Sequence, residues 1–206
     1  MRGLLLAMME PPPAMEEEFQ DWYDTEHFPE RATCEGFLTA HRFICIDGWP
    51  KYLALYDLAD TDVLRGPGYA RIAVDRYSAW THRIMPRMWG QYRADAAQVQ
   101  PGSALFGDAG AAARVLIWRF RQAPASAEAA ILAGLRTLYA DRPTVAQARL
   151  FRAHQPDGTD YAAIVELRTP QAPGSAEAFG EAMRYVDLVN VYVPYTRRLA
   201  GAFPKG

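Results

Sequence analysis

The fold is decided by a stretch that occurs twice, Lys-Tyr-Leu-Ala-Leu-Tyr-Asp-Leu at residues 51–58 and Asp-Tyr-Ala-Ala-Ile-Val-Glu-Leu at residues 160–167. Both copies are short runs rich in aromatic and aliphatic side chains, which is typical of β-strands. Turn-forming residues precede each copy, and before each turn lies another short run with strand character, at 39–44 and 146–151. The sequence therefore predicts two related β-hairpins.

The other elements that flank the hairpins also occur in pairs. These are an opening strand at 3–9 and 114–120, each followed by a helical stretch rich in Glu or Ala, a shorter helical stretch at 62–80 and 175–185, and a closing strand near 88–94 and 188–193. Each half thus has the order strand, helix, strand, strand, helix, strand, which is the ferredoxin-like βαββαβ unit.

Two such units in one chain dictate how the core is buried. Each four-stranded sheet is covered by helices on one face and must bury its other face. Packing the two sheets against each other meets that need, so we predict an α+β chain that forms a pseudo-dimeric α/β barrel. The predicted parts are one unit at residues 1–98, a linker rich in Gly, Ala and Ser at 99–111 and a second unit at 112–206.

The two halves differ most at residues 21–30, Asp-Trp-Tyr-Asp-Thr-Glu-His-Phe-Pro-Glu, because the matching residues 129–136 contain no histidine and no carboxylate. Pro29 lacks an N–H, so a helix that starts near Met15 is expected to stop or kink close to Phe28. Its last carbonyl groups would then lie beside His27 and would favour a protonated imidazole.

Tyr23 and Asp24 precede His27 by four and three residues, so on a helix they share its face and can orient the ring or tune its pKa. We predict that His27 and Asp24 carry out acid–base catalysis. The predicted substrate-binding residues are Trp22, Tyr23, Glu26, Arg42, Tyr52, Tyr56 and Trp80. The structural alternative is that His27 only ends a helix while the neighbouring aromatic residues pack in the core.

Alternation along the repeated strand separates Leu53 and Leu55 from Tyr52 and Tyr56. The leucines suit contact with the helices, so we expect the tyrosines to face the barrel interior. Arg42 and Arg149 occupy the same place in the two copies of the preceding strand. A buried arginine there would pair with a carboxylate or bind an anionic ligand, and the sequence leaves both open.

Composition excludes several classes of function. The chain has 206 residues with 22 Lys and Arg against 24 Asp and Glu, so no basic field exists to hold nucleic acid. The sequence contains no apolar run of the roughly 18 residues that a membrane span needs. Nucleotide-binding and metal-ligand spacings are also absent from the sequence, so we expect no metal and no cofactor. The two cysteines, Cys34 and Cys45, form no C-x-x-C pair and suit a reduced, cytoplasmic setting.

Residues 21–31, together with Gly-Phe-Leu-Thr-Ala-His-Arg-Phe at 36–43 and Pro-Lys-Tyr-Leu-Ala-Leu-Tyr-Asp-Leu at 50–58, resemble the EthD-like branch of the dimeric α/β-barrel superfamily. The resemblance covers the first half and reaches the second half through the repeat. Two ferredoxin-like chains usually pair in that superfamily, so the resemblance implies a fused tandem repeat here. It also implies that His27 lies at the barrel mouth as an acid, a base or a hydrogen-bond donor.

The superfamily includes cofactor-free monooxygenases, polyketide cyclases, muconolactone isomerases, aldoxime dehydratases and haem-handling enzymes, so fold alone does not fix function. We expect a small-molecule enzyme of the cyclase, isomerase, lyase or cofactor-free monooxygenase type, with His27 acting in a barrel pocket on a small hydrophobic or aromatic molecule. Three points stay open: a non-catalytic role in binding a hydrophobic metabolite or haem, for which His154 is the remaining axial candidate; a protein-binding role; and association into a homodimer.

Overall fold

Eight antiparallel strands close into one barrel in the computed structural model, which describes residues 1–73 and 76–195. The strands are β1 (Gly3–Glu10), β2 (His41–Asp47), β3 (Tyr52–Leu58), β4 (Trp89–Gln100), β5 (Arg114–Phe120), β6 (Val145–Gln155), β7 (Gly158–Leu167) and β8 (Val186–Pro194). Their order around the barrel is β1-β3-β2-β8-β5-β7-β6-β4. The predicted α+β class is confirmed, and β2–β3 and β6–β7 form the two predicted hairpins.

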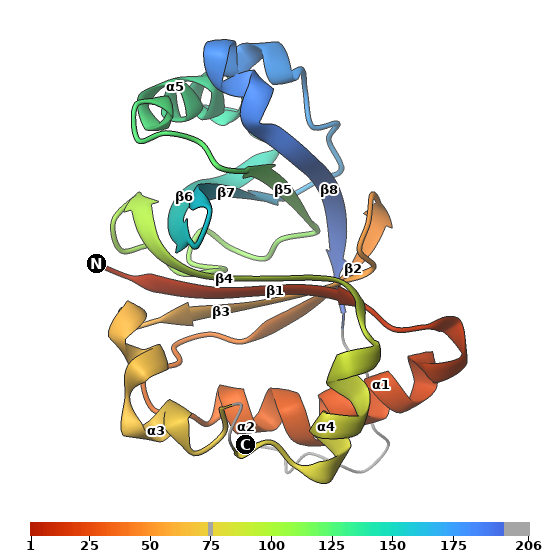
Figure 1. Cartoon of the computed structure of the whole chain (residues 1–206). Helices are drawn as coiled ribbons and strands as arrows, with labels where there is room; N and C mark the ends of the chain where they lie inside the picture. The colour runs from red at the N-terminus through yellow and green to blue at the C-terminus, as the bar shows by residue number, and fades with distance from the viewer. Residues whose placement is uncertain (74–75, 196–206) are drawn as a thin grey trace.

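Helices cover the barrel on two opposite sides (Figure 1). On the side of the first four strands lie η1 (Pro13–Met15), α1 (Glu16–Trp22), the π-helical turn η2 (Tyr23–His27), α2 (Phe28–Ala32), η3 (Thr61–Arg65), α3 (Pro67–Ala70), α4 (Ala79–Ile84) and η5 (Met85–Arg87). On the side of the last four strands lie α5 (Ala127–Tyr139) and η6 (Ala176–Tyr185). No helix within the described ranges is long and apolar enough to cross a membrane.

The two sets of four strands pair in the same order. The first set runs β4-β1-β3-β2 and the second β8-β5-β7-β6. Two antiparallel seams, β2 with β8 and β4 with β6, join the sets and close the ring. Each sheet therefore buries one face inside the barrel and the other beneath its own helices.

The barrel interior is filled by apolar side chains from all eight strands, as is usual for a barrel of this size. Leu53 and Leu55 belong to this interior, whereas Tyr52 and Tyr56 face the helices. The expectation that the tyrosines face inward is therefore wrong. The physical reason is that phenolic hydroxyls need hydrogen-bond partners, and the helical layer supplies them.

Arg42 and Arg149 do not occupy equivalent positions, although they align in the sequence repeat. Arg42 pairs across the ladder with Ala54, whereas Arg149 pairs with Ile164, the counterpart of Leu55. This shift of one residue turns the two side chains to opposite faces of the sheet. Arg42 consequently lies beneath the helices and Arg149 at one end of the barrel interior.

The predicted linker is part of the barrel. Its first two residues, 99 and 100, extend β4, and residues 104–108, here called the barrel plug, lie over the end of the barrel that holds Arg149. Arg149 is fully buried and lies 2.6 Å from Asp57 and 3.4 Å from Glu166. The backbone N–H groups of Phe106 and Gly107 donate to these carboxylates, at 2.6 Å and 2.9 Å. Buried ions paired in this way hold the plug in place.

Candidate functional site

The helix that carries His27 does not stop at Pro29. Instead, the N–H of Phe28 bonds to the carbonyl oxygen of Tyr23, five residues back, which makes residues 23–27 a π-helical turn. Helix α2 then begins at Phe28, so Pro29 falls in a first turn, where a missing N–H costs nothing. The predicted distortion is present, but it takes the form of an inserted wide turn rather than a helix end. Such turns occur often at functional sites.

His27 is buried between the helix and the sheet, with 6% of its surface exposed. Its ring centroid lies 4.2 Å from that of Trp22 and 5.0 Å from that of Tyr23. Burial, assisted by the positive charges of Arg31 and Arg42, holds the pKa of His27 well below its ordinary value of 6.5. The expected protonated imidazole is therefore wrong, because this ring is neutral at physiological pH.

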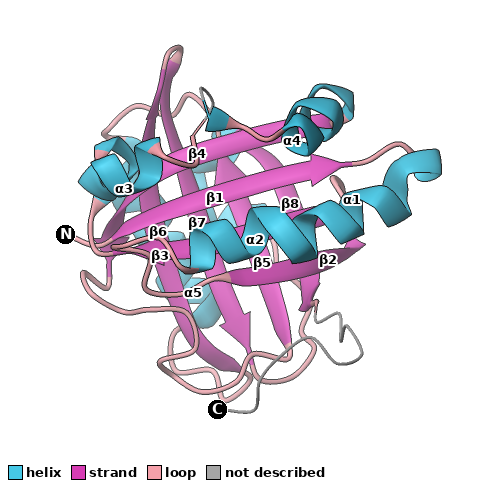
Figure 2. Cartoon of the chain, turned by 90° about the horizontal axis from the view of Figure 1, so that it is seen from below, coloured by secondary structure: helices cyan, strands magenta, loops and turns pink. Residues whose placement is uncertain are grey.

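The Nδ1 atom of His27 is buried and has no hydrogen-bond partner among the described residues. The ring borders a cavity of about 100 Å³ that lies between the first sheet and its helices. Figure 2 shows α1, α2 and α4 lying across the strands that form the floor of this layer. The site is thus outside the barrel, not at the barrel mouth as the resemblance implied.

Three predicted residues meet at the cavity: Tyr23, His27 and Tyr56. The hydroxyl oxygens of the two tyrosines are 3.4 Å apart. Burial raises the pKa of Tyr56 well above 10, so its hydroxyl keeps its proton at neutral pH. Trp22 supports the group from outside the cavity, since its ring packs on His27 and its Nε1 donates to Thr81 at 3.0 Å.

Asp24 does not pair with His27. The wide turn advances the chain, so residues three apart no longer share a face there. Asp24 instead forms an ion pair with Arg42, whose Nη2 also donates to Gln20 at 2.7 Å and whose guanidinium lies 4.0 Å from the ring of Tyr23. Of the two roles left open for Arg42, the structure has the ion pair.

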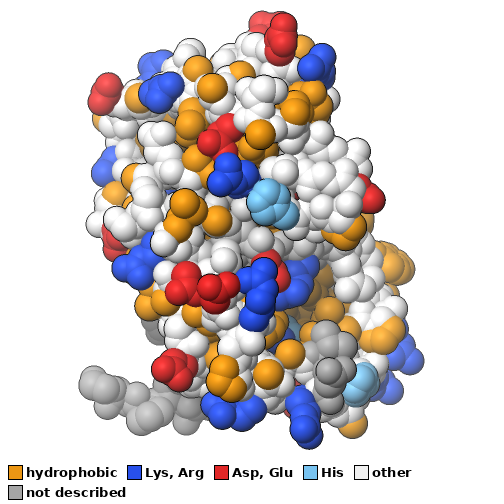
Figure 3. Space-filling view, turned by 60° about the vertical axis from the view of Figure 1, so that its left-hand side comes forward, with side chains coloured by type: hydrophobic (Ala, Val, Ile, Leu, Met, Phe, Trp, Pro, Cys, Tyr) orange, Lys and Arg blue, Asp and Glu red, His pale blue; other side chains and the backbone are white. Residues whose placement is uncertain are grey.

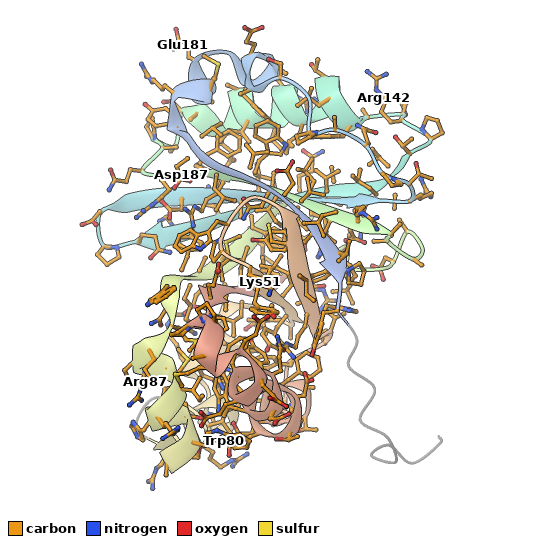
Figure 4. The ribbon with its side chains drawn as sticks, turned by 90° about the vertical axis from the view of Figure 1, so that its right-hand side faces the viewer. Lys51, Trp80, Arg87, Arg142, Glu181 and Asp187 are labelled. Atoms are coloured by element: carbon orange, nitrogen blue, oxygen red, sulfur yellow. The ribbon has the colours of Figure 1, made fainter. Side chains whose placement is uncertain are left out.

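The remaining predicted residues join helices to one another or to the sheet and do not line the cavity. Glu26 accepts hydrogen bonds from Ser78 and Thr81. Tyr52 donates to Glu16, and burial raises the pKa of its hydroxyl. Trp80 donates to Glu18 at 3.3 Å and lies in the lower helical layer, away from the barrel (Figure 4).

Sequence analysis missed several residues of the cavity wall: Arg31, Tyr69, Tyr77, Met85, Arg93 and the methionines of β1. Arg31 follows His27 by four residues and could have been found from that spacing. Apart from the methionines, which belong to β1 itself, the others come from the α3 to β4 region, whose approach to β1 depends on the whole sheet. Figure 3 shows the side of the molecule on which α3 lies, where Lys and Arg side chains gather with Asp and Glu side chains at mid-height, beside a hollow with hydrophobic side chains in its wall.

A larger hollow, of about 380 Å³, lies beside α5 and β6 and includes Leu132, Arg136 and Arg142 in its wall. It contains no histidine, and the hydroxyl of Tyr139, its buried polar group, is already hydrogen-bonded to Trp118 and Pro173. No group of three potential metal ligands occurs within residues 1–73 and 76–195. The cavity beside His27 is the stronger candidate because it combines a buried, unpaired proton acceptor with hydroxyl groups.

Comparison with sequence families and with curated proteins gives no match. Solved structures do match over nearly the whole chain. An anthrone oxidase-like protein aligns with a TM-score of 0.67 and 14% identity, over 97% of this chain and 93% of that one. A chlorite dismutase from Candidatus Nitrospira defluvii aligns with a TM-score of 0.54 and 9% identity, over 95% and 91%.

A haem-binding protein from Thermus thermophilus aligns with a TM-score of 0.51 and 11% identity, over 95% of this chain and 91% of that one. At these identities the likeness concerns the fold alone. The closed barrel, its two helical layers and these alignments agree. The chain therefore has the fold of the dimeric α/β-barrel proteins.

Proposed function

We propose that the protein is an enzyme in which His27 accepts a proton from a small phenol or from a carbon atom beside a carbonyl group. The observation that carries this proposal is the buried Nδ1 atom without a partner on the wall of a cavity. An unpaired buried polar atom destabilises a protein. Gln98, Arg149 and Tyr161 also have such atoms, but among the described residues only that of His27 belongs to a residue that lines this cavity. A ligand in the cavity would supply the missing partner.

The chemistry follows from the neutral ring. In the tautomer with a free Nδ1 lone pair, this atom takes the proton as the O–H or C–H bond of the substrate breaks. The electron pair stays on the substrate as a phenolate or an enolate. The positive charge of Arg31 stabilises that anion, and the hydroxyl groups of Tyr23 and Tyr56 are available as donors.

This step is common to cyclases, isomerases, lyases and cofactor-free monooxygenases, so the proposal covers that group of reactions. The anthrone oxidase-like neighbour is in keeping with it. A haem does not fit beside His27, because the cavity of about 100 Å³ is smaller than the roughly 300–1,000 Å³ of typical ligand pockets. His154 is exposed on β6 and lines none of the cavities described above. Binding of a small hydrophobic metabolite without catalysis is the second candidate, because the same cavity serves it.

The test follows proton abstraction directly and needs no knowledge of the full reaction. Small ketones and phenols are incubated with the protein in D₂O, and loss of the exchangeable carbon-bound protons is followed by NMR. We expect His27→Asn to lower the exchange rate by about 10²- to 10⁴-fold. His82→Asn, which changes an exposed histidine on α4, is the matched control and retains the rate. Equal rates for wild type and His27→Asn contradict the proposal, and binding without exchange favours the second candidate.

We also propose that the chain is a fused tandem of two ferredoxin-like units, residues 1–98 and 112–206 joined by 99–111, and that it belongs to the EthD-like branch. The common strand order of the two sets supports the duplication, and the motif around His27 supports the branch. The proposed setting is the cytoplasm, which suits the free thiols Cys34 and Cys45. A homodimer of the whole chain is the further association that we propose to test by light scattering.

A further inference from the structure

We infer that the substrate of the His27 cavity is a small carboxylic acid, whose carboxylate is held by the guanidinium of Arg31. This inference rests on the proposed function, because it names the class of molecule that His27 would deprotonate.

Arg31 is a buried cation with little to neutralise it. The residue is 3% exposed, and its Nη1 donates to the carbonyl oxygen of His27 at 3.1 Å. The nearest carboxylate, that of Glu30, lies 3.6 Å away, and 38% of the Glu30 side chain is exposed to solvent. A solvated carboxylate at this distance compensates a buried charge only weakly. An anionic ligand would supply the missing compensation.

The other residues of the cavity wall also favour an anionic ligand over a cationic one. The other charged residue there is Arg93, which pairs with Asp95 at 3.0 Å, and no Asp or Glu is found among the described residues that line the cavity. Tyr69 and Tyr77 add phenolic groups to the wall. A cationic ligand would therefore meet no opposite charge, whereas a carboxylate can accept two parallel hydrogen bonds from a guanidinium.

The position of Arg31 relative to His27 fits a bifunctional ligand. Arg31 lies one helical turn beyond His27, and both side chains border the cavity. Met9 and Met85 provide apolar, adaptable surface for the carbon chain of the ligand. The volume of about 100 Å³ is below the roughly 150 Å³ of an engineered cavity that binds benzene. The expected ligand is thus a short-chain acid, and an acid with a benzene ring tests the upper limit of size.

The test compares two acids with amides of the same shape. Protein labelled at its methionine methyl groups is titrated by NMR with crotonate and crotonamide, and then with benzoate and benzamide. Shifts of the methyl signals of Met9 and Met85 report occupancy of the cavity. We expect crotonate to bind at least about tenfold more tightly than crotonamide, as a charge-assisted hydrogen bond in a buried site implies.

Variants assign that preference to one residue. Arg31→Met should abolish the preference for crotonate and Arg31→Lys should retain part of it. Arg65→Met, which removes an exposed arginine paired with Asp62, should leave it unchanged. Thermal unfolding checks that each variant is folded. If Arg31→Met does not fold, the comparison of acid with amide on the wild type decides the question.

Two results would overturn the inference: equal affinity of the wild type for acid and amide, or wild-type affinity for crotonate in folded Arg31→Met. Its failure is distinct from that of the proposed function. Selective binding of crotonate with a proton-exchange rate unaffected by His27→Asn contradicts the role of His27 alone. Exchange that depends on His27, without selection for acids, contradicts the role of Arg31 alone.

Discussion

Among the single residues of this protein, His27 stands out because its burial lowers the stability of the fold. A buried imidazole with an unpaired Nδ1 is less stable than an apolar ring in the same place. A phenyl ring in place of His27 could pack equally well against Trp22 and Tyr23. Proteins retain such arrangements where activity requires them. The stability of the His27→Phe variant therefore tests whether the ring has a structural role.

We expect His27→Phe to be at least as stable as the wild type, with a gain of up to about 1 kcal/mol, because an unsatisfied polar atom is removed and the adjacent cavity admits the larger ring. Its proton-exchange activity should be lost. Urea unfolding gives the stability, and NMR gives the activity of the same sample. A clear loss of stability together with full exchange activity would show that His27 is there for packing.

The low pKa of His27 also predicts how stability depends on pH. The unfolded chain takes up a proton at His27 as pH falls below about 6.5, whereas the folded protein does not, so acidification favours unfolding. Between pH 7 and pH 5 this one group should lower the free energy of unfolding by up to about 2 kcal/mol. Urea unfolding at both values measures the loss. The loss should be smaller by that amount in His27→Phe, and an identical loss in both proteins would contradict the buried, neutral state.

At the scale of elements, the barrel plug links two sheets through buried charge. Arg149 neutralises Asp57 and Glu166, which in turn accept hydrogen bonds from the plug backbone. Removing the guanidinium leaves two carboxylates buried without a counter-charge. The cost of breaking a buried ion pair in this way is about 3–5 kcal/mol.

We therefore expect Arg149→Met to lose about 3–5 kcal/mol of stability and to release the plug. Hydrogen exchange of the Phe106 and Gly107 amides reports the release, and urea unfolding reports the stability. Arg65→Met, on the surface, should change neither quantity. Retained protection of both amides in folded Arg149→Met would contradict the assigned role.

The elements also mark what a sequence can predict about this protein. The hairpins, their turns and the repeated order of elements could be predicted from the sequence, because strand and turn residues act locally. The inward face of β3 was not, since every one of its 7 residues is buried, with the barrel on one side and helices on the other. Polarity therefore gave no contrast between the two faces. The π-helical turn was also not predicted. Pro29 indicates that the α-helical hydrogen bonding is interrupted, but it does not indicate whether the helix ends, kinks or widens there.

The candidate site was predicted only in part for the same reason. Tyr23, His27 and Tyr56 do meet at the cavity. Asp24 and Arg42 pair with each other outside it, because the wide turn changes which residues share a face. Tyr69 and Arg93 could not be predicted as part of the site from the sequence, since their approach to His27 depends on how β4 and the α3 region pack against β1.

At the scale of the whole molecule, two seams hold the sets of strands together, β2 with β8 and β4 with β6. Either set alone would expose both of its outer strands and the apolar face that fills the barrel. We expect residues 1–100 and 101–206, produced as separate chains, to associate one to one when mixed. Light scattering coupled to size-exclusion chromatography measures the complex. Two chains that remain stable, separate monomers would contradict the view that the barrel is a single folding unit.

The seam between β2 and β8 has a consequence for the newly made protein. It joins Phe43 to Pro194, so one of its strands leaves the ribosome long before the other. Throughout the intervening translation β2 has a free edge, and the leucines destined for the barrel interior have no covering sheet. Exposed strand edges and apolar faces are the features that lead unfinished chains to aggregate. The barrel can close only when β8 emerges from the ribosome. Until then we expect molecular chaperones to bind the nascent first half.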